Sequence, residues 1–444
     1  MCGAVGDEVR INAQLIDATT GGHLWADRYD GTLVDVFGLQ DQVVGDIVSA
    51  LAVQLTDAER KQAARIPTNN IEAYEYYLRG RHRGYSYTAT GLGYAQGFYQ
   101  RAIELDPDFA EAHAGYARVA AEYLSGVFGW ELLPADVARR RAYDSVTRAL
   151  ALDPNLPGAH SVLGVLHMLD GNHDEAVESA RKAVSLDSNS AEAFANLALV
   201  LTYAGRSTEA IPAMKAALRL DPNPSIGFLY IWGQVLFMNG QYEEALDVLT
   251  SVRSARDRNW IGGERIFLAM TMAALGRLDE ARSRTEHDVL SRVTTSWMNV
   301  TYARHLWAHH KRKEDLENML DALRKAGFPE WPSGYDVGGW DRLEGGEIEN
   351  LLFGRVWFGR NKNNFKPFAQ RTNDQGDVVY YLRGREWNGK VSVDDDRLCY
   401  KIPGMLLGRE FCGHLYRNPE GTPEDRNEHV LVDVFDVHYF SVKE

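Results

Sequence analysis

The chain has 444 residues, which is too long for one compact core, so we expect two to four structural units or one elongated array. Its formal net charge of −14 disfavours nucleic-acid partners, because nonspecific binding needs lysines and arginines that neutralise phosphates. The hydrophobic fraction of 45% is ordinary, and no stretch approaches the roughly 18 apolar residues that cross a bilayer. We therefore expect no membrane span.

The first residues and the cysteines indicate a cellular location. Residues 1–6 have neither the basic segment nor the apolar run of a signal peptide. The cysteines, Cys2, Cys399 and Cys412, are too few for a disulfide framework and lack the Cys-x-x-Cys spacing of a structural zinc site. The sequence therefore predicts a cytoplasmic protein with no metal site and no cofactor.

Residues 1–66 are predicted to form a short α/β unit. Apolar and polar residues alternate over residues 9–18, a turn follows at residues 19–22, and residues 23–29 form the returning strand of a hairpin. From Val34 to Leu55 the apolar period becomes that of an amphipathic helix. One hairpin and one helix bury little apolar surface, so the chain looks truncated at its front.

The same stretch carries a family resemblance. The phrases from Val9 to Asp30 and from Asp35 to Val43 resemble the last portion of the TolB/FlgO-like α/β domain. The resemblance covers about fifty residues, and it implies that residues 1–66 are a remnant of that domain.

From residue 71 to residue 328 the sequence repeats itself. Leu-Asp-Pro stands at Leu105, Leu152 and Leu220, and Gly-x-x-x-Glu-Ala begins at each of four glycines, Gly171, Gly205, Gly240 and Gly276. The spacing of roughly 34 residues is the tetratricopeptide period. We therefore expect an α-solenoid of about six or seven helix pairs, ending in an irregular pair over residues 293–327.

The recurring residues have physical reasons. Each glycine should end the first helix of a pair in the left-handed conformation, where other residues pay on the order of 1 kcal/mol. Small residues should sit where the two helices cross closely, namely Ala176, Ala210, Ala245 and Ala281. Proline after the second helix prevents its continuation.

Residues 333–444 are predicted to form a small antiparallel β-domain. Short β-branched or aromatic segments are separated by Asn-Gly, Asp and Pro-Gly turns. The expected strands are residues 378–383, 390–393, 397–401, 411–416 and 430–437. The chain as a whole is therefore expected to be mainly α-helical.

The order of these parts resembles the C-terminal half of bacterial class III adenylate/guanylate cyclase-related proteins. The phrases from Leu323 to Pro332 and from Arg397 to Thr422 carry this resemblance into the end of the chain. In that family a catalytic domain with two metal-binding aspartates precedes the TolB-like region, and none of its positions exists here. The resemblance therefore implies a regulatory role and no catalytic residue. TolB-like and repeat segments also follow winged-helix DNA-binding domains, which the terminal phrases disfavour.

The leading interpretation is a scaffold that binds a protein or peptide in the concave groove of the array. The first helices should line that groove, and their candidate partner-binding residues are His160, His167, Phe194, Tyr203, Tyr230, Gln234 and Arg265. Some of these residues should instead pack between repeats. The oligomeric state is left open.

Three further alternatives concern chemistry. His305 and His309 have the spacing of two metal ligands on one helix face, but the glutamate of a zinc protease is missing, so we expect a structural role. Cys399 and Cys412 fall on adjacent predicted strands and can form a disulfide or remain two buried thiols. A rival interpretation is an enzyme, with either a cyclase-related activity or small-molecule chemistry in the β-domain. The residues of that second site would be Trp357, Arg371, Arg385, Trp387, Arg397 and Tyr416.

Overall fold

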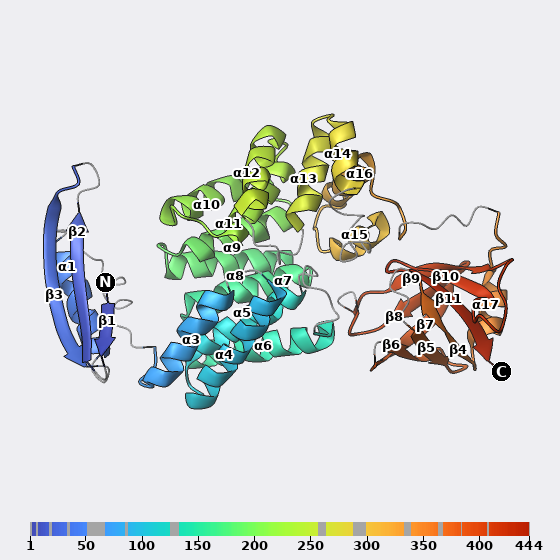
Figure 1. Cartoon of the computed structure of the whole chain (residues 1–444), viewed down its shortest axis with the longest axis horizontal. Helices are drawn as coiled ribbons and strands as arrows, with labels where there is room; N and C mark the ends of the chain where they lie inside the picture. The colour runs from blue at the N-terminus through green and yellow to red at the C-terminus, as the bar shows by residue number, and fades with distance from the viewer. Residues whose placement is uncertain are drawn as a thin grey trace.

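The computed structural model contains an N-terminal α/β unit, a helical array and a C-terminal β-barrel (Figure 1). It describes residues 2–5, 8–16, 20–32, 36–50, 67–84, 88–124, 133–255, 263–286, 299–332, 339–362, 367–382, 384–405 and 408–443. The predicted fold class is confirmed, with tetratricopeptide-type helices, an N-terminal hairpin and an antiparallel β-domain. None of the described helices combines the length and the apolarity needed to span a bilayer.

The N-terminal unit is a three-stranded sheet with one helix. Its elements are β1 (Cys2–Val5), β2 (Glu8–Ile16), β3 (His23–Thr32) and α1 (Val36–Ala50). The strands are antiparallel in the order β1-β2-β3, and the predicted hairpin is β2–β3. Val9, Tyr29 and Leu39 form its small core, which is consistent with one buried face per strand.

The array consists of seven helix pairs among the described residues. The helices are α3 (Ile71–Gly84), α4 (Ala89–Leu105), α5 (Ala110–Leu124), α6 (Ala135–Leu152), α7 (Pro157–Leu169), α8 (His173–Leu186), α9 (Ala191–Tyr203), α10 (Ser207–Leu220), α11 (Ile226–Met238), α12 (Tyr242–Ala255), α13 (Gly263–Ala274), α14 (Leu278–Arg284), α15 (Val300–Leu306) and α16 (Lys313–Lys325). Successive first helices, α3, α5, α7, α9, α11 and α13, contact one another along the array.

The predicted helix-ending glycines have the left-handed backbone. The φ angles of Gly171, Gly205, Gly240 and Gly276 are 81°, 72°, 72° and 76°. At the first of them, the Gly171 N–H donates to the Met168 carbonyl at 3.0 Å, and the next N–H, of Asn172, donates to the His167 carbonyl at 2.8 Å. This is the Schellman arrangement, which satisfies helix-end carbonyls and requires a residue without a Cβ penalty.

The small residues and the aspartates also lie where the repeat pattern requires them. Ala176, Ala210, Ala245 and Ala281 are fully buried, so the helices of a pair cross closely at these points. The aspartates of the repeats accept the N–H two residues further on, as the Asp153 carboxylate does from Asn155 at 2.9 Å. This side-chain turn reverses the chain after each second helix.

The C-terminal domain is a closed antiparallel barrel. Helix α17 (Gly345–Leu352) precedes β4 (Val356–Asn361), β5 (Pro367–Thr372), β6 (Asp377–Leu382), β7 (Arg385–Asp394), β8 (Arg397–Lys401), β9 (Phe411–Arg417), β10 (His429–Val432) and β11 (Val437–Lys443). The strand order is β10-β11-β4-β5-β6-β7-β8-β9, with β9 pairing with β10 to close the barrel. Side chains fill an interior of this size.

The barrel differs from its prediction in three places, the first of which is that β7 begins at Arg385, before the predicted segment 390–393. The segment 430–437 is two strands, because Asp433 makes a tight turn between β10 and β11 by accepting the N–H groups of Phe435 and Asp436 at 2.8 and 3.1 Å. Helix α17 and strands β4 and β5 were not predicted, although β4 and β5 have the alternating burial of strands with one inner face.

Candidate interaction surface

The inner face of the array is defined by side chains that join its first helices. The Arg118 guanidinium of α5 lies 3.9 Å from the Glu192 carboxylate of α9, and both helices contact α7. Asn196 of α9 donates to the Ser161 hydroxyl of α7 at 2.8 Å. Val165 is half-buried and lies four residues after Ser161, so it is on the same side of α7. This surface, carried by α5, α7 and α9, is called the inner face below.

Part of the array is covered by its own last helices. The ring of Tyr203, at the end of α9, packs against His309 and His310 with centroids 4.5 and 4.2 Å apart. The Lys311 N–H donates to the Tyr203 carbonyl at 2.9 Å, and the Lys311 ammonium pairs with Asp174 at 2.9 Å. The segment between α15 and α16 therefore lies against the end of α9 and the start of α8.

The histidines of this contact are held in the neutral form. Burial keeps the pKa of His309 well below its ordinary value, and neighbouring His310 lowers it further. Burial, with a contribution from His173, lowers the pKa of His310 to about 3. Burial also lowers the pKa of His305 to about 4, together with Arg409 and Arg304. At neutral pH the contact is therefore a packing of uncharged rings.

The barrel reaches the array through two turns. The loop between β8 and β9 places the Arg409 guanidinium 2.7 Å from the His305 carbonyl and 3.4 Å from the Leu169 carbonyl. The turn between β10 and β11 accepts a hydrogen bond from Asn299 at the Val434 carbonyl, 3.0 Å away. One contiguous apolar core therefore runs through the described parts of the array and the barrel.

These contacts correct part of the predicted site. Tyr203, Gln234 and Arg265 are buried, and Tyr203 lies under the chain's own histidines. The other predicted residues, His160, His167, Phe194 and Tyr230, are half-buried. The repeat pattern placed these residues on first helices but could not distinguish inner-face positions from packing positions, since both recur at helical spacing.

Two of the half-buried residues illustrate the packing role. The His160 imidazole lies 2.9 Å from the Pro154 carbonyl, which it joins across the turn before α7. The Tyr230 ring meets Phe267 edge to face, with centroids 5.9 Å apart. The structure instead pairs Arg118 with Glu192 and buried Ser161 with half-buried Asn196 across the first helices, and none of these four residues was predicted. Polar residues are common on helices, so the sequence gave no reason to select these four.

The barrel interior contains a polar chain that the sequence did not predict. The His438 imidazole lies 2.9 Å from the Asn361 amide oxygen and 3.0 Å from the Asp433 carboxylate. Burial opposes the charged form of His438, but the charge of Asp433 and its hydrogen bond outweigh it, so the pKa of His438 is raised. Because Asp433 also shapes the β10–β11 turn, this pair supports the turn that reaches α15.

The residues proposed for an enzymatic site do not converge in the part of the barrel that the structure describes. Trp357 and Trp387 are buried in the interior, whereas Arg371 and Arg385 are exposed. Arg397 pairs with the neighbouring Asp394 at 2.7 Å on the outside. The arrangement supplies the core and rim of a barrel.

Cys399 and Cys412 are cross-strand partners in β8 and β9. Their Cα atoms are 4.0 Å apart, and in the structure their sulfurs are bonded. Ligand-type atoms of Cys399, Cys412 and exposed Glu410 lie within 4.8 Å of one another. Two thiolates and a carboxylate are donors that zinc accepts, but only when the disulfide is reduced. That the pair is oxidised in the cell stays a prediction.

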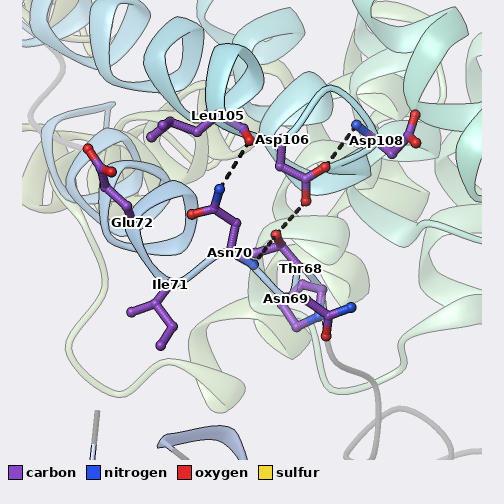
Figure 2. Close-up of a pocket in the computed structure, with 9 residues that line it drawn as sticks. Thr68, Asn69, Asn70, Ile71, Glu72, Leu105, Asp106 and Asp108 are labelled. Atoms are coloured by element: carbon purple, nitrogen blue, oxygen red, sulfur yellow. Dashed lines mark hydrogen bonds between the residues drawn. The ribbon is translucent and has the colours of Figure 1, made fainter. Parts of the chain in front are cut away.

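A shallow depression of about 810 Å³ lies where the chain enters the array (Figure 2). The side chains of Asn70 and Thr68 in its lining hold the first helix pair together. The Asn70 side chain donates to the Leu105 carbonyl at 3.1 Å and accepts the Ala73 N–H at 3.1 Å, and Thr68 donates to Asp106. Asp108 pairs with Arg148 at 2.6 Å. These contacts cap α3 and join it to the end of α4.

Comparison with known families agrees with the repeat fold. A tetratricopeptide-repeat model matches residues 139–191 and 195–259, and a second one matches residues 265–286. Among solved structures, the chain is similar to a thermophilic tetratricopeptide protein of Thermus thermophilus, with 16% identity and a TM-score of 0.34, over 46% of this chain and 98% of that one. It is also similar to PilF of Pseudomonas aeruginosa, with 19% identity and a TM-score of 0.34, over 50% and 91%.

A curated relative is the putative adenylate cyclase 3 of Rhizobium meliloti (strain 1021). The two sequences are 42% identical over 114 residues, which is 26% of this chain and 19% of that protein. The chain thus matches about a fifth of the length of this relative. The chain contains tetratricopeptide repeats within residues 139–286, and over 114 residues it is similar to a protein named as a putative adenylate cyclase.

Proposed function

We propose that the chain is a protein-interaction scaffold, a regulatory module of a cyclase-related signalling protein that binds a peptide or partner protein on the inner face of its array. The carrying observation is the row of polar contacts across successive first helices, Arg118 with Glu192 and Ser161 with Asn196. Side chains fixed on neighbouring rigid helices supply charge and hydrogen bonds in a set geometry, which is what recognition of an extended segment needs.

Site-specific photocrosslinking in the host cell tests this surface. A photoreactive residue in place of Val165, half-buried on α7, should join the chain to a defined partner protein. The matched position is Lys182, exposed on α8, which should give no such product. Arg118→Glu should abolish the product from position 165, because it reverses the charge opposite Glu192. Equal products from both positions, or a product that survives Arg118→Glu, would contradict the proposal.

The alternative is an enzyme with cyclase-related chemistry. It draws on the name of the 42%-identical relative, of which this chain matches 19%. Turnover of ATP and GTP by the purified chain, with Mg²⁺ and with Mn²⁺, distinguishes the two. The scaffold proposal expects no cyclic nucleotide. Product that persists through stringent purification, and that is lost on substitution of a barrel residue such as Trp387, would establish the enzyme instead.

A cytoplasmic location belongs to the same proposal. The low count of three cysteines supports it, because disulfide-framework proteins of oxidising compartments contain more. A Cys399–Cys412 disulfide weighs against it, because glutathione and thioredoxin keep cytosolic thiols reduced. Alkylation of the cysteines in intact cells, read by mass, decides between these signals.

A further inference from the structure

The loop between β8 and β9 meets three helix ends of the array at once. The Gly404 carbonyl accepts the N–H of Ala135, the first residue of α6, at 3.2 Å. The Arg409 guanidinium donates to the Leu169 carbonyl, the last of α7, and to the His305 carbonyl in the last turn of α15, at 3.4 and 2.7 Å. These three helix ends are called the loop site below.

The chemistry of the loop matches the polarity of each end. The N-terminus of a helix carries unpaired N–H groups and partial positive charge, and its C-terminus carries unpaired carbonyls and partial negative charge. Pro134 precedes α6 and provides no side-chain cap, so the Gly404 carbonyl takes that role. The Arg409 cation lies where two C-termini meet. The loop therefore supplies an acceptor at the start of α6, which has no side-chain cap, and a cation at the carbonyl ends of α7 and α15.

The contact is close and largely dry. Ile402 and Met405 are almost fully buried, and a Cβ placed on Gly404 would lie 2.4 Å from the Trp387 ring and 3.3 Å from the Asp136 carboxylate. Burial lowers the pKa of Arg409, with a contribution from Arg139, while Asp170 favours its charge. A cation is desolvated in this way only where specific acceptors replace water.

The shape of the loop is fixed at its base. Cys399 and Cys412 pair directly across β8 and β9, and their bond closes the chain just outside the contact residues. A closed loop loses less conformational entropy on docking than an open one. The loop therefore has the properties of a preorganised ligand that is carried by the same chain.

We propose that the loop site is a second binding site of the array, separate from the inner face, which recognises an arginine-bearing hairpin loop, and that the barrel's own loop occupies it as an exchangeable intramolecular ligand. The partner that fits it is a protein with a tight hairpin that presents one arginine and one free carbonyl. Such a partner displaces the barrel loop, so release of that loop from the array signals that the partner has bound at the loop site. The proposal does not depend on the inner face binding a peptide.

A synthetic peptide of residues 398–413, cyclised through its two cysteines and labelled with a fluorophore, tests the site in trans. An intramolecular ligand competes at an effective concentration on the order of millimolar, so the wild-type chain should bind the probe weakly. The full chain with Arg409→Glu should bind it at least about tenfold more tightly, because its own loop has lost both Arg409 contacts and competes less. The contact between Asn299 and Val434 remains in this variant and keeps the barrel attached.

Three controls make the result decisive. A probe with Arg409→Glu should bind neither chain, and the full chain with Arg397→Glu, the same charge change outside the contact, should behave as wild type. If Arg409→Glu fails to fold by circular dichroism, Arg409→Gln replaces it. Equal binding of the probe by wild type and variant, or binding by neither, would overturn the proposal, as would a dimer that exchanges loops between two copies. Crosslinking at Val165 tests the inner face separately.

Discussion

The ring of Tyr203 lies on the imidazole of His309, with centroids 4.5 Å apart and planes inclined by 18°. The two residues belong to α9, in the middle of the array, and to the segment after α15, near its end. In an ideal repeat array each unit contacts only its neighbours, so stability adds up from neighbouring interfaces. The Tyr203 contact joins distant repeats, and it makes the middle of the array depend on the end.

Removal of the Tyr203 ring should destabilise the chain. Tyr203→Ala loses packing against His309, His310 and Gln234, and we expect a loss of about 3 kcal/mol in the free energy of unfolding, as for other buried aromatic residues. Urea denaturation followed by circular dichroism measures it. Tyr94→Ala is the matched control, because that ring is 57% exposed and its removal should change stability by less than about 0.5 kcal/mol. Similar losses in both variants would show that Tyr203 is not a core residue.

Stability should fall on mild acidification because of the buried histidines. The pKa values of His305, His309 and His310 are lowered in the folded protein, so below pH 6.5 the unfolded chain binds more protons than the folded one. The free energy of unfolding should therefore decrease between about pH 6.5 and 4, by up to roughly 1.4 kcal/mol per pH unit for each histidine. Thermal unfolding across this range measures the slope.

His310→Phe isolates this effect, since it keeps a ring against Tyr203 but has no proton to gain. Its stability should depend less steeply on pH than that of the wild type. His438 has the opposite sign: its pKa is raised, so its contribution is present below pH 6.5 and is lost as pH rises through the folded value. An unchanged slope below pH 6.5 in His310→Phe would mean that His310 is not buried in the neutral form.

Two helical glycines should respond oppositely to alanine. A Cβ on Gly164 would meet the Ala176 carbonyl at 3.1 Å and the Ala180 nitrogen at 3.2 Å, so Gly164→Ala must push α7 away from α8. We expect a loss of roughly 1 to 3 kcal/mol. Gly97, exposed in α4, has nothing within 4 Å of its Cβ position, and Gly97→Ala should stabilise by about 0.5 to 1 kcal/mol. Denaturant midpoints of the two variants test the close crossing directly.

Reduction of the Cys399–Cys412 pair should weaken the barrel. The bonded cysteines are separated by 13 residues, for which the chain-entropy model gives a stabilisation of roughly 3 kcal/mol. The melting temperature should fall when dithiothreitol is added to the wild type and should not change in Cys399→Ser. Alkylation of the denatured but unreduced chain should add one adduct, at Cys2. Three adducts would show that Cys399 and Cys412 are two buried thiols instead.

The repeat array could be read from the sequence because its signals are local. A left-handed glycine such as Gly171 and a small residue such as Ala176 are imposed by the geometry of one helix pair, so they recur wherever the pair recurs. The hairpin β2–β3 could also be predicted, since the alternation of apolar and polar residues fixes which face of a strand is buried. These features made the fold class, and a scaffold interpretation, predictable from residue order.

The residues that line the inner face were not predictable, because their positions depend on where distant elements meet. His160 and Ser161 are neighbours on α7, and only packing decides that the first joins the Pro154 carbonyl while the second meets Asn196 of α9. The same reason applies to Tyr203, which has the residue type of a contact site but is buried under a segment that follows much later.

The sequence by itself therefore determined the repeat period, the helix ends and the strand alternation, all of which follow from backbone sterics over a few residues. Tertiary structure alone decided that residues 309–311 cover the end of α9, that the barrel closes between β9 and β10, and that Arg409 meets the ends of α7 and α15. These contacts join segments far apart in the chain. Their energy comes from desolvation and from the pairing of helix-end groups, which no local pattern encodes.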